Sequence, residues 1–466
     1  MDKNKKPIKL NPFVIIFYVV IVCGILTFLI TPGTLENGVY TPLPKNELNF
    51  NNLFNIFRAI PYGIKDTANL VILILVVGGA LEIYNRTGAI DAGISSLVTK
   101  FGKGSNNALL LALLIVVFSA IGGFLGWIET LIPFIPIVIS FILALGYDSM
   151  TAVAVCIIGT MGGFVAGPTN LYTVGVCNGI IQKMGLLPEG SDVFVGLEYR
   201  VIIWAVITLV SVLYIMAYAI KVRKDPSKSL VADIDVSDIG LNAEKANSKL
   251  TTRHIFILLT IVVAMILTVI GMRTGFDGVT WGIDDVSSVF FLSGLLSGII
   301  ARMNATEISD AFIQGARGAI SGAIIVGVAR GVYWILNTAN VNATIVYYAI
   351  EALKGTSPLV AGIGIIIIVT FLNGLIPSGS GKGVLLSPIL VPIGLSLGLS
   401  PQSTVLAYQF GDGITNMFWF SYGTLLIFLN YGKVPIDRWY KFYVPLMGIF
   451  FILAFIFLAI ALKIGF

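Results

Sequence analysis

The sequence predicts an all-α protein that crosses a membrane many times. Of its 466 residues, 57% are hydrophobic and only 11% are charged, whereas soluble domains carry about 25% charged residues. The mean hydropathy is +0.94, and apolar runs of roughly 20 residues, long enough to cross a bilayer, alternate with short polar segments. The 50 glycines and 18 prolines predict closely packed and interrupted helices. This composition excludes an ordinary soluble globular protein.

The chain before residue 66 is predicted to contain one span and an external segment. Four lysines among the first nine residues precede an apolar run over 13–30. This run is longer than the apolar region of a signal peptide, which is about 7–15 residues. We therefore expect an uncleaved span that begins in the cytoplasm, followed over 31–65 by an external loop with an interfacial helix.

A hydrophilic stretch divides the rest of the chain into two halves. The apolar runs before it cover 66–84, 107–126, 131–146, 150–166, 170–182 and 200–220. The stretch itself carries seven basic residues, which predicts a cytoplasmic location, as for the N-terminus. We expect an N-terminal half (1–220), a cytoplasmic linker (221–253) and a C-terminal half (254–466).

The C-terminal half contains several short apolar runs. The runs cover 254–272, 286–301, 318–337, 358–375, 384–399, 403–411, 416–430 and 443–464. Several are too short to cross about 30 Å of hydrocarbon at about 1.5 Å per residue. Short, Gly-interrupted segments in corresponding places of two halves are typical of re-entrant hairpins and discontinuous helices.

One stretch of the N-terminal half recurs in the C-terminal half. The segment that starts at Leu131, LIPFIPIVISFILALGYDSMTAVAV, is similar to the segment that starts at Leu385, LLSPILVPIGLSLGLSPQSTVLAY. Further along, a Gly-x-Thr-Asn motif occurs at 167–170 and again at 413–416, each time within an apolar segment. These matches predict an inverted repeat, with a chance similarity between Gly-rich apolar segments as the alternative.

The two motifs place polar side chains where the membrane disfavours them. Such groups are costly unless they face a cavity or a partner, and a helix break exposes backbone groups that need the same protection. The hydroxyl and amide oxygens are hard ligands. Thr169, Asn170, Thr415 and Asn416 are therefore predicted to hold a small cation such as Na⁺, or the polar end of a substrate.

Each half also has a polar, Gly-rich break before its motif. The break in the C-terminal half is 373–383, NGLIPSGSGKG, with four glycines and two serines in eleven residues. We expect a tight re-entrant tip in which Ser378, Gly379 and Ser380 face a binding cavity. The counterpart in the first half is 122–130, GGFLGWIET.

Two acids lie near these breaks, Glu129 and Asp412. An intramembrane carboxylate is by default a functional-site hypothesis, with a carboxylate at the membrane interface as the alternative. We favour a substrate role for Glu129 and a coupling or gating role for Asp412. Lys382 could neutralise one of these acids or hold a substrate carboxylate. Trp419, just after the second motif, could contact substrate or only pack.

Other polar residues carry simpler predictions. Arg330 lies near the middle of an apolar run and needs a partner, either an ion pair or a substrate. Glu82 and Arg86 are four residues apart, which predicts a salt bridge on one helix face. The three cysteines are not closely spaced and His254 is the only histidine, so neither a disulfide framework nor a zinc site is expected.

Several blocks of the sequence resemble a known family. They are IPSGSGKG, VLAYQFGDGITNMFW, IGTMGGFVAGPTNLYTVGV, VGVARGVYWIL and VVGGALEIYNRTGAIDAGI. The chain resembles the YfcC-type members of the anaerobic four-carbon dicarboxylate carrier (DcuC-like) family, in the ion transporter superfamily. The resemblance implies a multi-pass secondary transporter of the bacterial inner membrane, with an inverted-repeat fold, two re-entrant hairpins and a homodimeric assembly. It also assigns the coupling ion and substrate to Ser378, Gly379, Ser380, Thr169, Asn170, Thr415 and Asn416.

The resemblance leaves the substrate open. Members of this group are named both as dicarboxylate carriers and as basic amino-acid exchangers, and relatives often have Gln where this chain has Lys382. We expect a small organic solute, either an amino acid or a dicarboxylate, and coupling to Na⁺ or H⁺ or to exchange. We expect no cofactor, and the net charge of +5 is too dispersed for a nucleic-acid partner.

The sequence favours a secondary transporter that works by alternating access, and not an enzyme. An ion channel is one alternative, although a channel needs a continuous pore. A membrane-embedded enzyme is another, although the His and Cys constellations of most such enzymes are missing from the sequence. Saturable counterflow in proteoliposomes would distinguish a transporter from a channel.

The charge distribution yields a first testable prediction. A cysteine placed at Ser227 should not react with a membrane-impermeant reagent added to intact cells, because the basic linker holds this position in the cytoplasm. It should react once the cells are permeabilised. Labelling in intact cells would contradict the predicted orientation.

Overall fold

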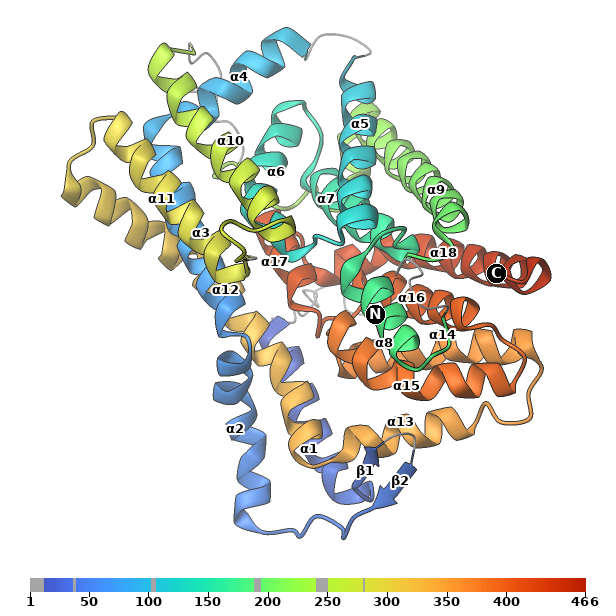
Figure 1. The fold of residues 1–466 in the computed structure, drawn as a ribbon. Helices are drawn as coiled ribbons and strands as arrows, with labels where there is room; N and C mark the ends of the chain where they lie inside the picture. Colours follow the sequence, from blue (N-terminus) through green and yellow to red (C-terminus); the bar gives the residue numbers. More distant parts are fainter. Residues whose placement is uncertain (1–11, 37–38, 102–105, 188–193, 240–249, 280) are drawn as a thin grey trace, which may run out of the picture.

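The computed structural model describes residues 12–36, 39–101, 106–187, 194–239, 250–279 and 281–466. The lysines of the first nine residues and positions 240–249 of the expected linker lie outside this part. Most of what it describes is helical (Figure 1).

Nine α-helices, three shorter helical elements and two short strands make up the described first half. In order they are α1 (Pro12–Leu29), β1 (Gly33–Glu36), β2 (Val39–Pro42), α2 (Phe50–Asp66), α3 (Ala68–Thr87), α4 (Ala89–Phe101), α5 (Asn106–Ala120), the π-helical turn η1 (Ile121–Leu125), the 3₁₀ helix η2 (Glu129–Phe134), α6 (Ile135–Ala144), α7 (Ser149–Ala166), the π-helical turn η3 (Leu171–Gly175), α8 (Val176–Lys183) and α9 (Leu197–Lys224). The turn η1 follows α5 directly, since α5 ends at Ala120 and η1 begins at Ile121.

The remaining elements follow a short 3₁₀ helix, η4 (Pro226–Lys228). They are α10 (Thr252–Arg273), α11 (Ile283–Ile300), α12 (Ala305–Thr338), α13 (Val341–Glu351), α14 (Pro358–Leu375), α15 (Gly379–Ser396), α16 (Pro401–Asn416), α17 (Gly423–Tyr431) and α18 (Ile436–Ile464).

Within the described residues, nine helical stretches are long and apolar enough to cross a membrane. They are Ala68–Thr87, Asn107–Leu125, Ser149–Lys183, Leu197–Lys224, Thr252–Met272, Ile283–Ile300, Ala305–Thr338, Pro358–Leu375 and Ile436–Ile464. The expected first span is present as the shorter apolar helix Ile16–Leu29. The all-α, multi-pass architecture predicted from composition is therefore confirmed.

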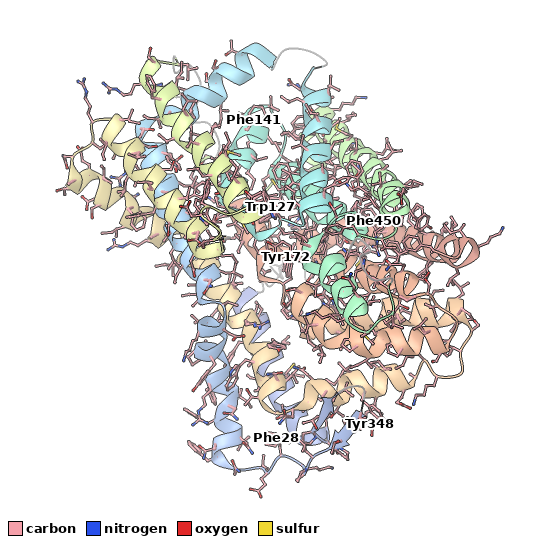
Figure 2. All side chains as sticks on the ribbon, in the orientation of Figure 1. Phe28, Trp127, Phe141, Tyr172, Tyr348 and Phe450 are labelled. Carbon is pink, nitrogen blue, oxygen red and sulfur yellow. The ribbon has the colours of Figure 1, made fainter. Side chains whose placement is uncertain are left out.

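The helices form two groups (Figure 1), and α17 contacts both of them, through α12 in one group and α7 in the other. In one group α12 packs against α1, α2 and α3, and α11 packs against α3. In the other, α7 packs against α5 and α9, α16 packs against α14 and α18, and α7 and α16 contact each other. Figure 2 shows Trp127 and Tyr172 at the centre of the molecule, and Phe28 and Tyr348 at one end.

The central helices begin at N-cap residues that the sequence supplies. Asp148 caps α7 by accepting the backbone N–H of Thr151 at 2.9 Å, and Ser400 caps α16 in the same way through Ser403 at 3.0 Å. Each cap provides a side-chain acceptor for an N–H that has no partner within the helix. These starts therefore follow from local sequence, even though both helices are buried.

The helices α7 and α16 form the core of the second group. All 18 residues of α7 are buried, as is every residue of α16 from Gln402 to Asn416. Glycine allows this contact, since a Cβ on Gly413 would lie 2.7 Å from the Cα of Val165 in α7. A Cβ on Gly411 would lie 2.6 Å from a backbone oxygen of α14.

Two predictions about the breaks are wrong in detail. The segment around Asp412 and the second Gly-x-Thr-Asn motif is helical and forms the last turns of α16, because its glycines permit close packing and do not interrupt the helix. The expected tip over 373–383 is also shorter. Only 376–378 lies outside helices α14 and α15, with Ser378 as the N-cap of α15.

The segment over 31–65, which is predicted to be external, also differs from its prediction. It contains the expected helix, α2, but also an antiparallel pairing of β1 with β2 in which Thr34 is opposite Thr41. The Asn-Gly pair at 37–38 is a common hairpin signal.

The expected salt bridge between Glu82 and Arg86 is present at 3.1 Å.

Replacing Gly413 with Ala should destabilise the protein by about 1–3 kcal/mol, because the added methyl group overpacks the contact between α7 and α16. Thermal unfolding of the purified protein would measure this loss. Gly448→Ala in α18 is the matched control, since a Cβ there meets nothing within 4 Å. Equal stability of the two variants would contradict the role assigned to the close packing.

Candidate functional site

A cavity of about 310 Å³ lies where the two groups of helices meet. Its lining includes six of the residues that the sequence predicts for the site: Glu129, Ser378, Gly379, Ser380, Asp412 and Asn416. Opposite them lie residues of α3 and α12, among them Leu70, Val326 and Arg330. Thr169, Asn170, Lys382, Thr415 and Trp419 are outside this lining.

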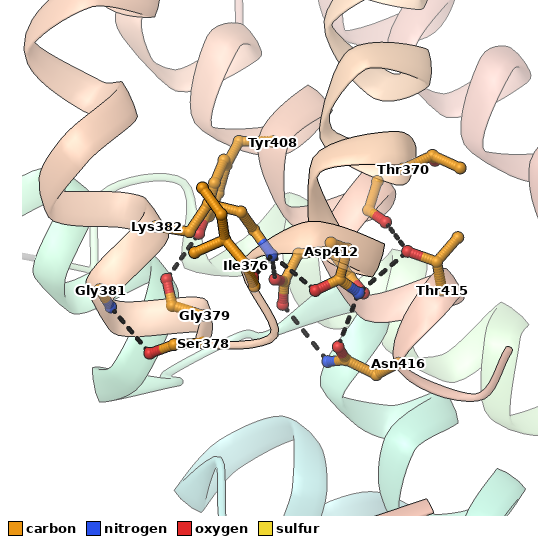
Figure 3. Close-up of polar contacts among 12 residues, drawn as sticks. Thr370, Ile376, Ser378, Gly379, Gly381, Lys382, Tyr408, Asp412, Thr415 and Asn416 are labelled. Atoms are coloured by element: carbon orange, nitrogen blue, oxygen red, sulfur yellow. Dashed lines mark hydrogen bonds and ion pairs between the residues drawn. The ribbon is translucent and has the colours of Figure 1, made fainter. Parts of the chain in front are cut away.

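Lys382 forms an ion pair with Asp412, one of the residues that line the cavity (Figure 3). Its Nζ lies 2.7 Å from Asp412 Oδ1, and both side chains are fully buried. The same Nζ donates to Asn373 Oδ1 at 2.6 Å and to the carbonyl oxygen of Ile376 at 3.2 Å. Of the two roles considered for Lys382, the contacts therefore match neutralisation of an acid.

Asn373 is a central residue of this network that the sequence analysis did not select. Its amide nitrogen donates to Thr415 Oγ1 at 3.0 Å and to Asn416 Oδ1 at 2.8 Å. It also lies 3.0 Å from the backbone oxygen of Asp412. Asn373 thus joins the end of α14 to the end of α16. The sequence signal that could have identified Asn373 is its position at the start of the polar break over 373–383.

The first turn of α15 presents backbone N–H groups to the cavity. Ser378 Oγ accepts the N–H of Gly381 at 3.2 Å, and the N–H of Lys382 bonds to the Ser378 carbonyl at 2.9 Å. The N–H groups of Gly379 and Ser380 have no carbonyl acceptor within the helix, and both residues line the cavity. This end of the cavity is therefore suited to a carboxylate.

Glu129, the first residue of η2, lies on the other side of the cavity. Tyr422 donates its hydroxyl to Glu129 Oε1 at 2.8 Å. Tyr422 precedes α17, so the hydrogen bond joins the break of the first half to the break that follows α16. Among the described residues, no ion pair involves Glu129.

The first Gly-x-Thr-Asn motif forms the break between α7 and η3. Gly167 has a φ of +52°, which glycine adopts without the strain of a side chain. Thr169 donates to the carbonyl of Phe124 at 2.6 Å, and Asn170 Oδ1 accepts the N–H of Tyr172 at 2.9 Å. Both polar side chains therefore stabilise the break itself.

Two further candidates have partners away from the cavity interior. Arg330 forms an ion pair with Asp66 at 2.6 Å and stacks on Tyr333, with 4.1 Å to the ring centroid. Trp419 donates its Nε1–H to the carbonyl of Thr370 at 2.6 Å. The roles predicted for these residues in substrate binding stay predictions.

The four residues predicted as Na⁺ ligands bond to other protein groups in this arrangement, and the Na⁺ site stays a prediction. In the second half, Asn416 Oδ1 and Thr415 Oγ1 both accept hydrogen bonds from Asn373. In the first half, Thr169 and Asn170 bond to backbone groups. Across the described residues there is also no group of three or more His, Cys, Asp or Glu side chains that could hold a metal ion.

Comparison with known proteins assigns the chain to a family. Residues 11–463 match the model of the DcuC family, described as the C4-dicarboxylate anaerobic carrier. The chain belongs to the DcuC family. With its apolar helices, it is therefore a multi-pass membrane protein of a transporter family.

Two curated relatives cover most of this DcuC-family chain. A protein of Escherichia coli K12 named "Putative basic amino acid antiporter YfcC" is 31% identical over 83% of this chain and 76% of its own. An uncharacterized protein of Haemophilus influenzae is 26% identical over 90% of this chain and 80% of its own. A solved structure, the YdaH transporter of Alcanivorax borkumensis, covers 98% of this chain and 99% of its own, with 14% identity and a TM-score of 0.44.

Replacing Asn373 with Ala should lower the free energy of unfolding by about 2–3 kcal/mol, because it removes a hydrogen bond to the buried ammonium and leaves Thr415 and Asn416 without their donor. Thermal or denaturant unfolding would measure the change. Asn337→Ala, at an exposed position of α12, is the control and should shift stability by less than about 0.5 kcal/mol. A neutral Asn373→Ala would show that the network is dispensable.

Proposed function

We propose that this DcuC-family chain is a secondary transporter in the bacterial inner membrane that carries amino acids by alternating access, with a preference for cationic ones. The observation that carries the preference is the charge balance of the cavity. Of its charged lining residues, Asp412 is neutralised by Lys382 and Arg330 is bound to Asp66. Glu129 alone among them has no cationic partner in the described part of the chain.

An uncompensated carboxylate in a partly dry cavity attracts an ammonium or guanidinium group, because the alternative is a desolvated charge without a partner. At the other end, the N–H groups that begin α15 and the hydroxyl of Ser380 suit a carboxylate. The cavity thus offers one acceptor for a cation and one donor set for an anion. That pair of features matches an amino acid.

A dicarboxylate is less well matched, although the family description names C4-dicarboxylates. Two carboxylates would need two cationic or donor-rich ends, and one end holds Glu129. The sole cation in the described lining, Arg330, is already paired. The name of the E. coli relative, which refers to basic amino acids, is in line with the same preference.

A second cavity supports access from two sides. Its volume is about 600 Å³, and it shares with the first cavity the wall formed by α3 and α12. The first cavity contacts the start of α17 at Gly423 and Thr424, whereas the second contacts its end at Asn430 and Tyr431. Movement of α6, η2 and α17 along this wall would close one cavity and open the other.

The second cavity is lined by residues from the middle of the proposed cytoplasmic linker. Asp238 and Ile239 belong to its lining, Asp238 forms an ion pair with Lys433, and Ser140 donates to the Ile239 carbonyl at 2.6 Å. We therefore assign this cavity to the cytoplasmic side, with the linker dividing the halves 1–220 and 254–466.

An inverted repeat with two re-entrant hairpins is part of the proposal. Pairs of helices correspond in order, α5 with α14, α6 with α15, α7 with α16 and α9 with α18. The contacts of the two halves are equivalent. In the first, α7 packs on α5 and α9, and in the second, α16 packs on α14 and α18. Likewise, α6 contacts α17, and α15 contacts α8. A homodimer, with coupling to an ion or to exchange, completes the proposal.

Replacing Glu129 with Gln should raise the half-saturation concentration for lysine or arginine by about 30-fold or more, because a buried charge pair is worth about 2–5 kcal/mol. Gln can still accept the hydrogen bond from Tyr422, so the fold should be retained. Uptake and counterflow in proteoliposomes would measure the effect.

The control is Glu351→Gln, which removes an acid that is paired with Lys354 outside the cavity. It should leave uptake unchanged. Wild-type uptake of a dicarboxylate such as succinate, with no uptake of lysine or arginine, would contradict the proposed substrate class.

A further inference from the structure

We propose that the ammonium group of Lys382 occupies a cation site at the break between α14 and α15, so that this half of the transporter contains its own cation and binds no Na⁺ there. The inference deepens the proposed function, because the same site forms the cavity floor. It concerns ion binding, however, and does not depend on which solute is carried.

The first step is the set of atoms around Nζ. Three oxygens surround it, a carboxylate oxygen of Asp412 at 2.7 Å, the amide oxygen of Asn373 at 2.6 Å and the carbonyl oxygen of Ile376 at 3.2 Å. An ammonium group has three N–H donors; two of them bond to Asn373 and Ile376, and the charge is paired with Asp412. Backbone carbonyls freed by a helix break, such as that of Ile376, also coordinate cations in discontinuous-helix transporters.

The second step is the orientation of Asn373. Its amide nitrogen faces Asn416 Oδ1 and Thr415 Oγ1, which leaves its oxygen toward Lys382. The opposite orientation would place an NH₂ group against an ammonium and an oxygen against two acceptors. The network of α14 and α16 therefore presents an oxygen to a cation at this point.

The third step is charge and burial. Lys382 and Asp412 are both fully buried, and Asn373 and Ile376 are nearly so. The carboxylate of Asp412 is already balanced by one positive charge. A Na⁺ ion entering the same oxygens would add a second charge in a region of low dielectric constant, where uncompensated charges are strongly disfavoured.

The inference assigns to Lys382 the cation that the sequence predicted to be Na⁺ in the second half. Thr415 and Asn416 lie next to this position, but they bond to Asn373 and not directly to a cation. The positive charge that the motif was expected to recruit from solution is supplied by a side chain four residues into α15. Lys382 is thus the residue that determines which cation this site contains.

The test compares Na⁺-specific stabilisation of the wild-type protein with that of Lys382→Met, which keeps most of the side-chain volume but removes the ammonium. Thermal unfolding is measured in NaCl and in choline chloride at equal ionic strength. The variant should gain at least about 2 °C in Na⁺, because an ion that binds only the native state stabilises it. The wild-type midpoint should not differ between the two salts.

Two controls separate the site from general salt effects. The double variant Lys382→Met/Asp412→Asn removes both charges and should lose the response to Na⁺. Lys354→Met breaks the exposed pair with Glu351 and should show no response. A Na⁺ shift in the wild type as large as in Lys382→Met, or no Na⁺ shift in Lys382→Met, would overturn the proposal.

Uptake by the wild type provides a measurement that does not need a stable variant. Replacing Na⁺ by choline on both sides of proteoliposomes should leave solute counterflow unchanged, and Lys382→Arg should unfold at the same temperature in both salts. Counterflow that requires Na⁺ in the wild type and no longer requires it in Lys382→Arg would overturn the proposal even if Lys382→Met cannot be purified, because the Na⁺ dependence would then depend on this site. Failure to transport amino acids would instead contradict only the proposed substrate.

Discussion

The interior of the molecule depends on one constraint, that backbone groups freed by a helix break must find partners where no water is available. Buried side chains from α9 and α18 supply several of these partners. Arg200 donates to the Ala166 carbonyl at the end of α7, Trp439 to the Met417 carbonyl after α16, and Tyr443 to the Ile414 carbonyl within its last turn. Because these contacts are buried, the two breaks have fixed positions, and the cavity between them has a defined shape.

The same constraint explains the charge of the site. The end of α14 is satisfied by groups of other segments, since Ser421 donates to the Gly374 carbonyl at 2.7 Å and Lys382 to that of Ile376. Lys382 therefore bonds both to the carbonyl at the helix break and to Asp412. Neither Lys382 nor Asp412 is left to bind a charged group of the solute. Glu129, held by a neutral tyrosine hydroxyl, is the carboxylate that remains available. The proposed preference for a cationic amino acid follows from this division of roles between the two breaks.

Glycine has two different functions in this chain, and the sequence alone does not separate them. At Gly167 it permits a left-handed backbone conformation where α7 ends. At Gly411 and Gly413 it permits contact between helices that remain regular. Both uses produce the same local signal, a Gly-rich polar stretch in an apolar segment. For that reason the sequence places a break around Asp412, whereas the helix continues to Asn416. It also predicts a tip over 373–383 that is longer than the observed one over 376–378.

The sequence by itself determined that the protein is a multi-pass helical membrane protein of the DcuC family, because hydropathy, span length and motif spacing are local properties of the chain. It also identified six of the residues that line the cavity, since polar groups inside apolar segments are conspicuous. Only the tertiary structure decided their partners. Lys382 pairs with Asp412, Arg330 pairs with Asp66, and Asn373 joins two helices. The Asn373–Asn416 and Arg330–Asp66 contacts connect residues 43 and 264 positions apart, so they depend on how whole helices pack.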